Sequence, residues 1–322
     1  MSSASSSTDV TRIRRLLSAL PREVILRSAD SPFLQRVVRR YGMRLGASRF
    51  VAGETLDECI AVLRRLNDAG LYANTTVLGE AIPDAAGAEP VVEEYLEVLD
   101  RLASERLRAN PAVKLTHLGL SFDEEVAHAN VERLVARAEG HGLFLRIDME
   151  QSAFVDATLR VYERLRAAGH DNVGTVLQSY LYRTADDLVR LLPLGPNLRI
   201  VKGAYLEPPT LAFPEKRDVD AAYVRLVEHG LREGAYIAVA THDERIIARV
   251  EAFVARERID PGRYEFQMLY GVRPSLQRAV AGRGHKVLVA TPYGPDWYPY
   301  LMRRLAERPA NLLFFLRHLV RG

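Results

Sequence analysis

The feature that most constrains the fold is the regular alternation, after Gly70, of short apolar runs with longer amphipathic ones. The short runs are rich in Val, Ile, Leu and Tyr and are bounded by Gly, Pro, Asn or His, which is typical of buried parallel strands. Eight such runs occur, at Leu71–Val77, Val113–Leu118, Phe144–Asp148, Gly174–Gln178, Leu198–Gly203, Tyr236–Thr241, Tyr264–Leu269 and Lys286–Thr291. The helical patterns that follow them are Pro90–Arg108, Glu124–Glu139, Phe154–Ala168, Ala185–Leu192, Val219–Glu233, Glu244–Glu257, Pro274–Ala281 and Pro295–Arg308. Eight β/α units predict a (β/α)8 TIM barrel of the α/β class.

A doubly wound open sheet is the alternative fold. It needs fewer strands and usually carries a glycine-rich nucleotide turn after a strand. No G-x-G-x-x-G motif or P-loop follows any strand in this sequence. The barrel is therefore the favoured fold.

The sequence before the barrel predicts a separate organisation. Residues 1–9 are rich in Ser and lack an apolar core, so we expect a disordered lead-in and not a secretory signal. Residues 10–70 show helical spacing, notably at Arg12–Leu20, Pro32–Tyr41 and Leu56–Ala69. The barrel then extends over residues 71–322.

Charge and cysteine content narrow the class of protein. The net charge of +3 comes from basic residues that are widely spread, so nucleic-acid binding is not indicated. The single cysteine, Cys59, cannot form an intrachain disulfide and suits a reducing compartment. The sequence contains no stretch of 18 apolar residues, so we expect no membrane span. The apolar residues 312–321 either pack against the body, which we favour, or touch a membrane surface.

Polar residues gather where the predicted strands end, which is where the active sites of such barrels lie. They are Glu80, Asp148, Gln178, Lys202, Tyr205, Thr241, His242, Glu265 and Gln267. Lys114 falls earlier, near the start or middle of the second strand. A lysine inside an apolar run is costly unless it is paired, so we interpret Lys114 as an inward, functional residue.

The last helical pattern carries Tyr300, Arg303, Arg304 and Glu307 at i, i+3, i+4 and i+7, which places them on one helix face. Two adjacent guanidinium groups suit a carboxylate. Glu307 can hold one arginine in place, and Tyr300 offers an apolar wall with a polar tip. A solvated surface with i,i+4 pairing is the competing interpretation, and spacing alone does not separate the two.

The candidate chemical groups around the predicted mouth are mostly cations with one acid, and this suits an anionic ligand or two. They are Lys114, Asp148, Gln178, Arg199, Lys202, His242, Arg303 and Arg304. A substrate carboxylate and a cofactor phosphate are the candidates. Gly203 and Ala204 follow a strand and allow close approach of a bulky ligand, although Gly203 would also serve a simple turn. No set of His, Asp and Glu residues has the spacing of a metal site, and no G-x-S-x-G elbow occurs.

Taken in order, the motifs resemble those of the proline dehydrogenase family. The likeness is to the small bacterial monofunctional enzymes and to the proline dehydrogenase domain of bifunctional proline utilisation flavoenzymes. The motifs are residues 77–80 (VLGE), 113–115 (VKL), 147–150 (IDME), 176–178 (VLQ), 199–205 (RIVKGAY), 240–242 (ATH), 265–267 (EFQ), 292–294 (PYG) and 300–304 (YLMRR). Each motif is weak alone, but the ordered set is specific.

The resemblance implies a distorted barrel with non-covalent FAD and a final helix over the flavin. By this likeness Arg303 and Arg304 bind the proline carboxylate beside Lys114, and Glu80 pairs with Arg303 when the site closes. Asp148 and Arg199 match the active-site acid and the arginine near flavin N5. The matches to FAD contacts are Met149, Gln178, Lys202, Gly203, Ala204, Thr241 and His242. Glu307 matches the glutamate one turn beyond the arginines.

The implied reaction is hydride transfer from proline C5 to flavin N5, which gives Δ1-pyrroline-5-carboxylate. It needs orientation and not a strong nucleophile, and Asp148 is expected to orient rather than to act as an obligatory base. The resemblance further implies reoxidation by a quinone. We therefore expect a cytoplasmic protein with transient contact at the inner membrane face, and self-association is open.

One position departs from the family pattern. Ala290 falls where many members carry a tyrosine that packs on the substrate ring. If the register is shifted by one or two residues, Tyr293 or Tyr298 supplies the phenol. If it is not, the pocket gains space and 4-hydroxyproline becomes a substrate candidate. Two other classes stay open: a Schiff-base lyase with Lys114 or Lys202 as nucleophile, and a non-catalytic proline sensor.

Overall fold

The computed structural model describes residues 36, 38, 42–43, 46–79 and 82–307. Within these residues the chain forms a closed barrel of eight parallel strands in sequence order. The strands are β1 (Tyr72–Val77), β2 (Ala109–Lys114), β3 (Leu145–Asp148), β4 (Val173–Gln178), β5 (Asn197–Val201), β6 (Tyr236–Ala240), β7 (Tyr264–Leu269) and β8 (Val287–Tyr293). The barrel closes through β1 and β8, where Tyr72 pairs with Leu288 and Val77 with Tyr293. The predicted fold class is confirmed.

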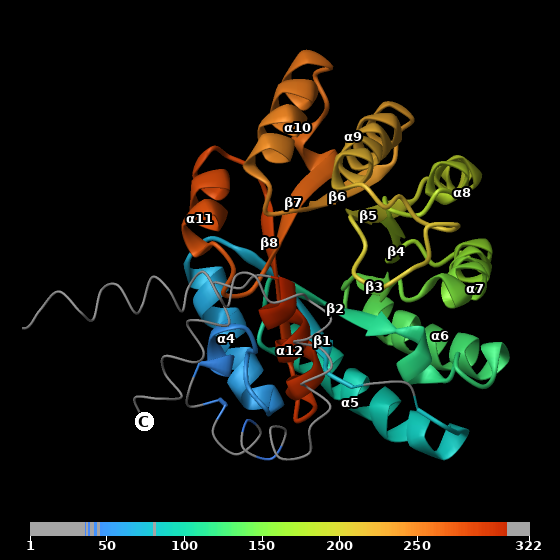
Figure 1. Cartoon of the computed structure of the whole chain (residues 1–322). Coiled ribbons are helices and arrows are strands. Elements are labelled where there is room, and N and C mark those ends of the chain that lie inside the picture. The colour runs from blue at the N-terminus through green and yellow to red at the C-terminus, as the bar shows by residue number, and fades with distance from the viewer. Residues whose placement is uncertain (1–35, 37, 39–41, 44–45, 80–81, 308–322) are drawn as a thin grey trace, which may run out of the picture.

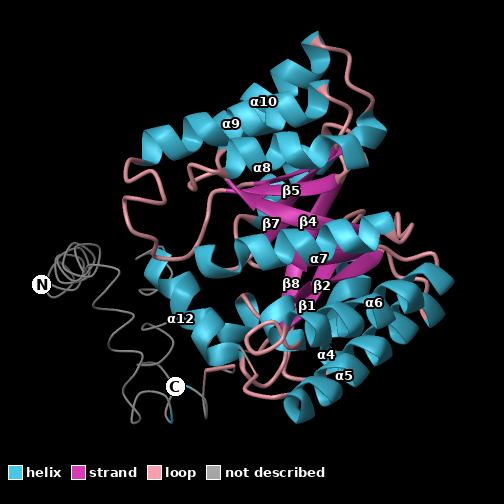
Figure 2. Cartoon of the chain, turned by 90° about the vertical axis from the view of Figure 1, so that its right-hand side faces the viewer, coloured by secondary structure: helices cyan, strands magenta, loops and turns pink. Residues whose placement is uncertain are grey.

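Helices surround the strands. They are α4 (Leu56–Asp68), α5 (Ala85–Ser104), α6 (Glu124–Gly140), α7 (Val155–Ala167), α8 (Thr184–Leu191), α9 (Lys216–Arg232), α10 (Glu244–Arg256), α11 (Pro274–Gly282) and α12 (Trp297–Glu307). Short 3-10 turns are η1 (Ala47–Arg49), η2 (Leu115–Leu118), η3 (Ser152–Phe154), η4 (Leu192–Leu194) and η5 (Pro261–Arg263). Figures 1 and 2 show α4 to α11 around the outside of the barrel, whereas α12 lies across one end of it.

The helices bury their apolar stripes against the strands, and side-chain caps fix where several of them begin. Thr55 caps α4 in a reciprocal capping box with Glu58. Asp84, Asp123 and Asp243 cap α5, α6 and α10 through their carboxylates. The main core lies between the sheet and these helices.

A second apolar cluster anchors α12. It consists of Val38, Ala47, Phe50, Val51, Leu78, Val272, Trp297, Tyr298, Leu301 and Met302. Trp297 is 1% exposed, and its indole nitrogen donates to Glu54 at 2.6 Å. This packing joins α12 to the segment before the barrel, and so fixes where the arginine-bearing helix lies.

Several predicted boundaries were wrong. The strand predicted at Val113–Leu118 begins at Ala109 and ends at Lys114, and Leu115–Leu118 is the turn η2. The helix predicted at Pro90–Arg108 begins at Ala85, because Asp84 supplies the cap, and includes Pro90. The fifth strand ends at Val201 and does not reach Gly203, where φ is +115°.

The division of the chain into three segments stays a prediction. Arg12–Leu20, the lead-in and residues 312–321 lie outside the described residues, as does most of Pro32–Tyr41. Leu56–Ala69 is confirmed as a helix, α4. In the part of the chain that the structure describes, every helix is too short or too polar to cross a bilayer.

Candidate active site

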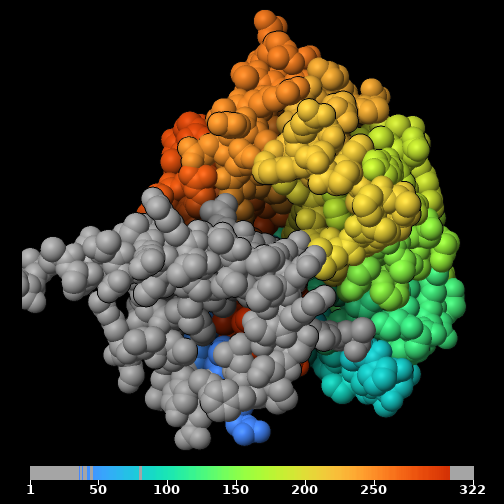
Figure 3. Space-filling model, viewed as in Figure 1, coloured from blue at the N-terminus to red at the C-terminus, as the bar shows by residue number. Residues whose placement is uncertain are grey.

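A cavity of about 800 Å³ opens at the carboxyl ends of the strands. The sequence-predicted residues in its walls are Lys114, Asp148, Met149, Gln178, Arg199, Lys202, Gly203, Ala204, Tyr205, Thr241, His242, Gln267 and Arg304. In Figure 3 the surface is hollowed beside the segments coloured yellow and orange, in the range of β5 to β7. Residues that are far apart in sequence thus meet at one end of the barrel, as the strand-end argument predicts.

Of the residues predicted on one face of α12, Arg304 lines the cavity, whereas Arg303 and Tyr300 do not. Arg304 lies in the wall, and its guanidinium carbon is 5.3 Å from the centroid of the Tyr300 ring. Arg303 and Tyr300 are not among the wall residues, but the charge of Arg303 acts on Tyr205, which is in the wall. Both arginines are half-buried, so they are not a fully solvated pair. Glu80 and the side chain of Glu307 lie outside the described residues.

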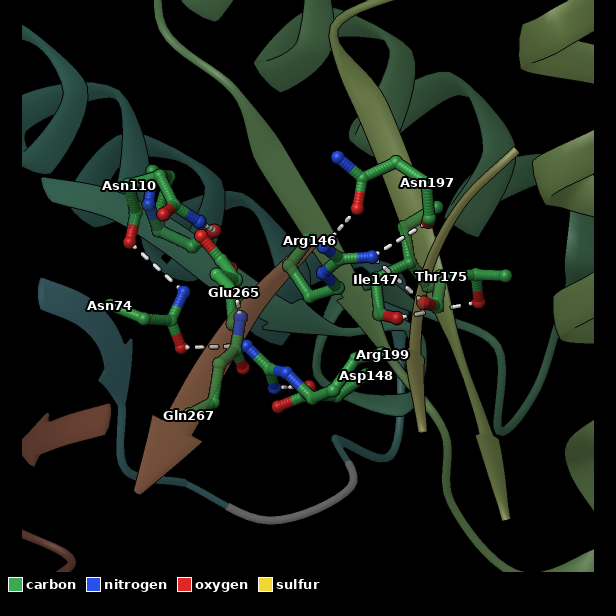
Figure 4. Close-up of polar contacts among 12 residues, drawn as sticks. Asn74, Asn110, Arg146, Ile147, Asp148, Thr175, Asn197, Arg199, Glu265 and Gln267 are labelled. Carbon is green, nitrogen blue, oxygen red and sulfur yellow. Dashed lines mark hydrogen bonds and ion pairs between the residues drawn. The ribbon is translucent and has the colours of Figure 1, made fainter. Parts of the chain in front are cut away.

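Arg199 and Asp148 form the central ion pair of the site. Nη1 of Arg199 donates to Oδ1 of Asp148 at 2.7 Å, and Nη2 donates to Oδ1 of Asn74 at 3.1 Å. Figure 4 shows these groups converging from β5, β3 and β1 inside the barrel. Arg199 is 8% exposed, so water screens the pair weakly.

Lys114 is the last residue of β2, not an early one, and this places it at the mouth. The turn η2 follows it immediately and is tied to the neighbouring strand. Glu150 accepts hydrogen bonds from the backbone nitrogen and the hydroxyl of Thr116, at 3.1 and 2.7 Å. Burial raises the pKa of Glu150, which the Thr116 bonds oppose. The two hydrogen bonds between Thr116 and Glu150 fix the chain just beyond Lys114.

Lys202 lies in a charge network at the rim. Its ammonium nitrogen is 2.5 Å from Asp220 and 3.5 Å from Asp243. Lys216 pairs with the same Asp220. Although burial acts against it, the two lysines lower the pKa of Asp220 below its ordinary value. The network holds Lys202 against two carboxylates and brings a second cation, Lys216, to the cavity wall.

His242 has a defined tautomer. The backbone nitrogen of Leu269 donates to its Nε2 at 2.9 Å, so Nε2 is the acceptor and Nδ1 carries the proton. Arg273 donates to the carbonyl of His242 at 2.8 Å. The loop after β6 is thereby fastened to the end of β7.

Gly203 is required by packing as well as by its backbone. A Cβ on Gly203 would stand 2.3 Å from the ring of Tyr180, and φ is +115°. The space that a side chain would need is therefore filled by Tyr180. Gly203 lines the cavity, and close approach of a ligand to its backbone stays a prediction.

The barrel interior below the cavity is also polar, as Figure 4 shows. Arg146 donates to the carbonyl oxygens of Thr175 and Asn197, at 2.9 and 2.7 Å. Burial, reinforced by the charge of Arg199, lowers the pKa of Arg146 to about 9. Glu265 does not belong to the mouth, contrary to prediction. It is the second residue of β7, 3% exposed, and 2.8 Å from Lys286.

Several wall or supporting residues were missed by sequence reasoning. They are Asn74, Glu150, Lys216, Arg245 and Arg273. Glu150 belongs to the motif 147–150 (IDME), so its proximity to Asp148 was an available signal. Burial, together with Glu150 and Asp148, raises the pKa of Tyr205, so its phenol stays protonated. Within the described ranges no group of three or more His, Cys, Asp or Glu residues could hold a metal ion.

The closed barrel and its cation-rich mouth define a (β/α)8 protein with a ligand cavity at the carboxyl ends of its strands. The sequence model of the family described as proline dehydrogenase matches residues 59–317. The chain therefore belongs to the proline dehydrogenase family, and the resemblance stated above is confirmed.

Two relatives and one solved structure show the extent of the likeness. The chain is 40% identical over 300 residues to proline dehydrogenase 1 of Bacillus subtilis, covering 93% of this chain and 99% of that protein. It is 40% identical over 311 residues to the proline dehydrogenase of Deinococcus radiodurans, covering 95% and 100%. A crystal structure of proline utilization A (PutA) from Bdellovibrio bacteriovorus, inactivated by N-propargylglycine, matches with a TM-score of 0.78 at 22% identity. That match covers 93% of this chain and 36% of the other, and supports the fold.

Proposed function

We propose that this chain oxidises L-proline to Δ1-pyrroline-5-carboxylate with non-covalently bound FAD, and that a quinone takes the electrons onward. The observation that carries the proposal is the meeting of Arg304, Lys114 and the Arg199–Asp148 pair in one cavity. Membership of the proline dehydrogenase family supports the substrate. The cavity volume of about 800 Å³ lies in the range of small-molecule and cofactor sites.

The cavity residues suit a flavin. Oε1 of Gln178 and Nε of Arg199 are buried polar atoms that lack a hydrogen-bond partner within the protein. Such atoms are costly unless a ligand satisfies them. The edge of an isoalloxazine ring carries both donors and acceptors, which can satisfy an amide oxygen and a guanidinium N–H. The backbone of Gly203 and Ala204, with Met149 and the Thr241–His242 pair, would hold the remainder.

When bound, FAD supplies the two-electron acceptor for hydride removal from C5 of proline. The protein supplies orientation. Arg304, with Arg303 beside it, holds the substrate carboxylate in a guanidinium fork, and Lys114 adds a third cation. Asp148 remains an acceptor for Arg199, so it fixes that arginine and is not required to take a proton. The half-buried α12 limits the access of water.

Lys202 is less suited to the rival lyase chemistry. A Schiff base needs an amine nitrogen directed at a carbonyl carbon, whereas this ammonium group is held between Asp220 and Asp243. A sensor would bind proline at the same carboxylate site without turnover. Neither rival accounts for the unpartnered polar atoms of Arg199 and Gln178 in residues that line a wide cavity.

Ala290 favours a second candidate substrate, 4-hydroxyproline. Ala290 lies in the cavity wall, and its register is fixed opposite Asn74 of β1. Tyr293 cannot replace the missing phenol, because its hydroxyl donates to Glu94 at 3.1 Å behind the barrel wall. Tyr298 packs in the α12 cluster and is not a wall residue. The pocket thus has room for a hydroxyl group on the substrate ring.

The experiment that tests the proposal is identification of cofactor and product from the purified protein. Denaturation without protease should release a yellow compound with the mass of FAD, and incubation with L-proline and a soluble benzoquinone should yield pyrroline carboxylate. Borohydride added with a 2-oxo acid, whose carbonyl a Schiff-base lysine would attack, should leave the protein mass unchanged. A colourless protein, or a borohydride-fixed adduct on a lysine, would contradict the proposal and favour the lyase.

A further inference from the structure

The guanidinium of Arg199 is held from two sides of the barrel. Asp148 on β3 accepts from Nη1 at 2.7 Å, and Asn74 on β1 accepts from Nη2 at 3.1 Å. Figure 4 shows Asn74 on the side of Arg199 away from Asp148. Asn74 is 1% exposed, so its amide must form its hydrogen bonds with other groups inside the barrel.

The orientation of the Asn74 amide is set by a second contact. Its Nδ2 donates to the backbone carbonyl of Asn110 on β2 at 3.0 Å. Because the donor end is used there, the acceptor end faces Arg199. The backbone oxygen of Asn74 accepts from the hydroxyl of Thr291 on β8 at 2.9 Å. The residue is therefore fixed by both neighbouring strands and spans the interior to reach β5.

An amide has one property here that a carboxylate lacks. It accepts from a guanidinium without adding negative charge. Arg199 already faces one carboxylate, and a second one at position 74 would over-compensate its charge. Cations near a flavin favour the reduced, negatively charged form, so a neutral acceptor preserves the influence of Arg199 on the cavity.

We propose that Asn74 is a positioning residue that fixes the guanidinium of Arg199 in the cavity wall through a neutral hydrogen bond, so that its charge remains effective there. This inference rests on the proposed function for its effect on the flavin. The fixed orientation of Arg199 itself is independent of any cofactor. Nothing in the chain other than Asn74 and Asp148, within the described residues, accepts a hydrogen bond from this guanidinium.

Two variants of Asn74 separate charge from orientation. Asn74→Asp keeps the shape and the acceptor but adds charge, so the flavin midpoint potential should become more negative than in the wild-type holoenzyme. Asn74→Ala removes the contact, so kcat with proline should fall about tenfold, as expected for a lost hydrogen bond to a charged group. KM for proline should change less than about twofold, because Arg199 does not hold the carboxylate.

Thr75→Val is the matched control. Thr75 is the next residue of β1, fully buried, and its hydroxyl donates to the carbonyl of Thr291 at 3.0 Å and lies 3.2 Å from Sγ of Cys59. Thr75→Val loses these two buried contacts without touching Arg199, so its potential and kcat should match the wild type. Thermal unfolding of all three variants checks that each is folded.

The orientation is read directly from the Nε–Hε resonance of Arg199 by ¹⁵N NMR. Wild-type protein should show one slowly exchanging signal, and Asn74→Ala should broaden it or exchange it faster. An unchanged signal would overturn the positioning role. So would an Asn74→Asp potential equal to or above that of the wild type, or equal losses in Thr75→Val. A wild-type protein that proline fails to reduce contradicts the proposed function instead, and the resonance still decides the role of Asn74.

Discussion

The imidazole ring of His117 lies directly against Gly79, so that a Cβ on Gly79 would stand 2.3 Å from Cε1 of the ring. His117 belongs to η2, just beyond Lys114, whereas Gly79 follows β1. The contact joins two loops at the barrel mouth, and the loop of Gly79 continues into Glu80. The carboxyl ends of β1 and β2 are thus fastened to each other by ring-to-backbone packing.

We predict that Gly79→Ala lowers both stability and activity. The added methyl group must displace a buried ring, and overpacking of this kind costs roughly 1–3 kcal/mol. Chemical unfolding should show that loss, and kcat/KM for proline should fall with it, because η2 positions Lys114. Gly87→Ala is the control, because Gly87 lies inside α5 and a Cβ added there would stand 3.5 Å from its nearest neighbouring atom. That variant should be stabilised by roughly 0.5–1 kcal/mol. Equal behaviour of the two variants would contradict the prediction.

His117 should also give stability a defined dependence on pH. Burial, reinforced by the charge of Lys114 and opposed by Asp296, lowers the pKa of His117 to about 4 from its ordinary 6.5. The unfolded chain therefore binds the proton first, so the free energy of unfolding falls as pH drops from 6.5 towards 4. The full loss from this group is roughly 3 kcal/mol.

The measurement is denaturant unfolding between pH 7.5 and 4 for wild type and His117→Gln. The variant should lose less stability over this range, and the difference between the two curves should appear only below about pH 6.5. His229→Gln, at an exposed position on α9, controls for removal of a histidine. Parallel curves for wild type and His117→Gln would show that the buried imidazole does not contribute.

Arg304→Lys tests recognition of the substrate carboxylate. The change keeps the charge but removes the planar fork, so kcat/KM for L-proline should fall roughly 10- to 100-fold. Pyrrolidine lacks a carboxylate, and its kcat/KM should change less than about threefold. Steady-state rates on both amines give the comparison, with Arg225→Lys on α9, outside this cavity, as control. Equal losses on the two substrates would argue for a structural role of Arg304.

Ala290→Tyr tests the enlarged pocket. A phenol in the cavity wall should fill the space beside the substrate ring, so the ratio of kcat/KM for L-proline to that for trans-4-hydroxy-L-proline should rise about tenfold. Ala290→Ser adds a polar atom with little volume and should stay near the wild-type ratio. No gain in proline preference in the tyrosine variant would count against the hypothesis.

The fold was largely predictable because buried parallel strands carry a strong local signal. Tyr264–Leu269 was predicted with the observed bounds. The second strand was misplaced because Asn110 and Pro111 are disfavoured in strands, whereas the leucines at 115 and 118 extend the apolar pattern beyond Lys114. Closure of the barrel tolerates Pro111 there, and Leu115–Leu118 is buried in a 3-10 turn instead. Tertiary packing, which sequence patterns do not show, overrode local preference.

The site was predictable only where residues follow strands. Lys114, Asp148 and Gln178 end strands, and their meeting follows from barrel topology. Asn74 lies in the middle of β1, and no local pattern tells that it reaches Arg199 across the barrel. The position of α12 was implied only by the family resemblance and not by local pattern, because it depends on Trp297 packing against the segment before the barrel.

An anaerobic titration of the purified protein with L-proline tests the central claim most directly. The account predicts a flavin spectrum that bleaches fully as proline is added, and that loses this response when Arg304 is changed to Lys at the same proline concentrations. A protein whose flavin stays oxidised in excess proline, or one that carries no flavin at all, would contradict it.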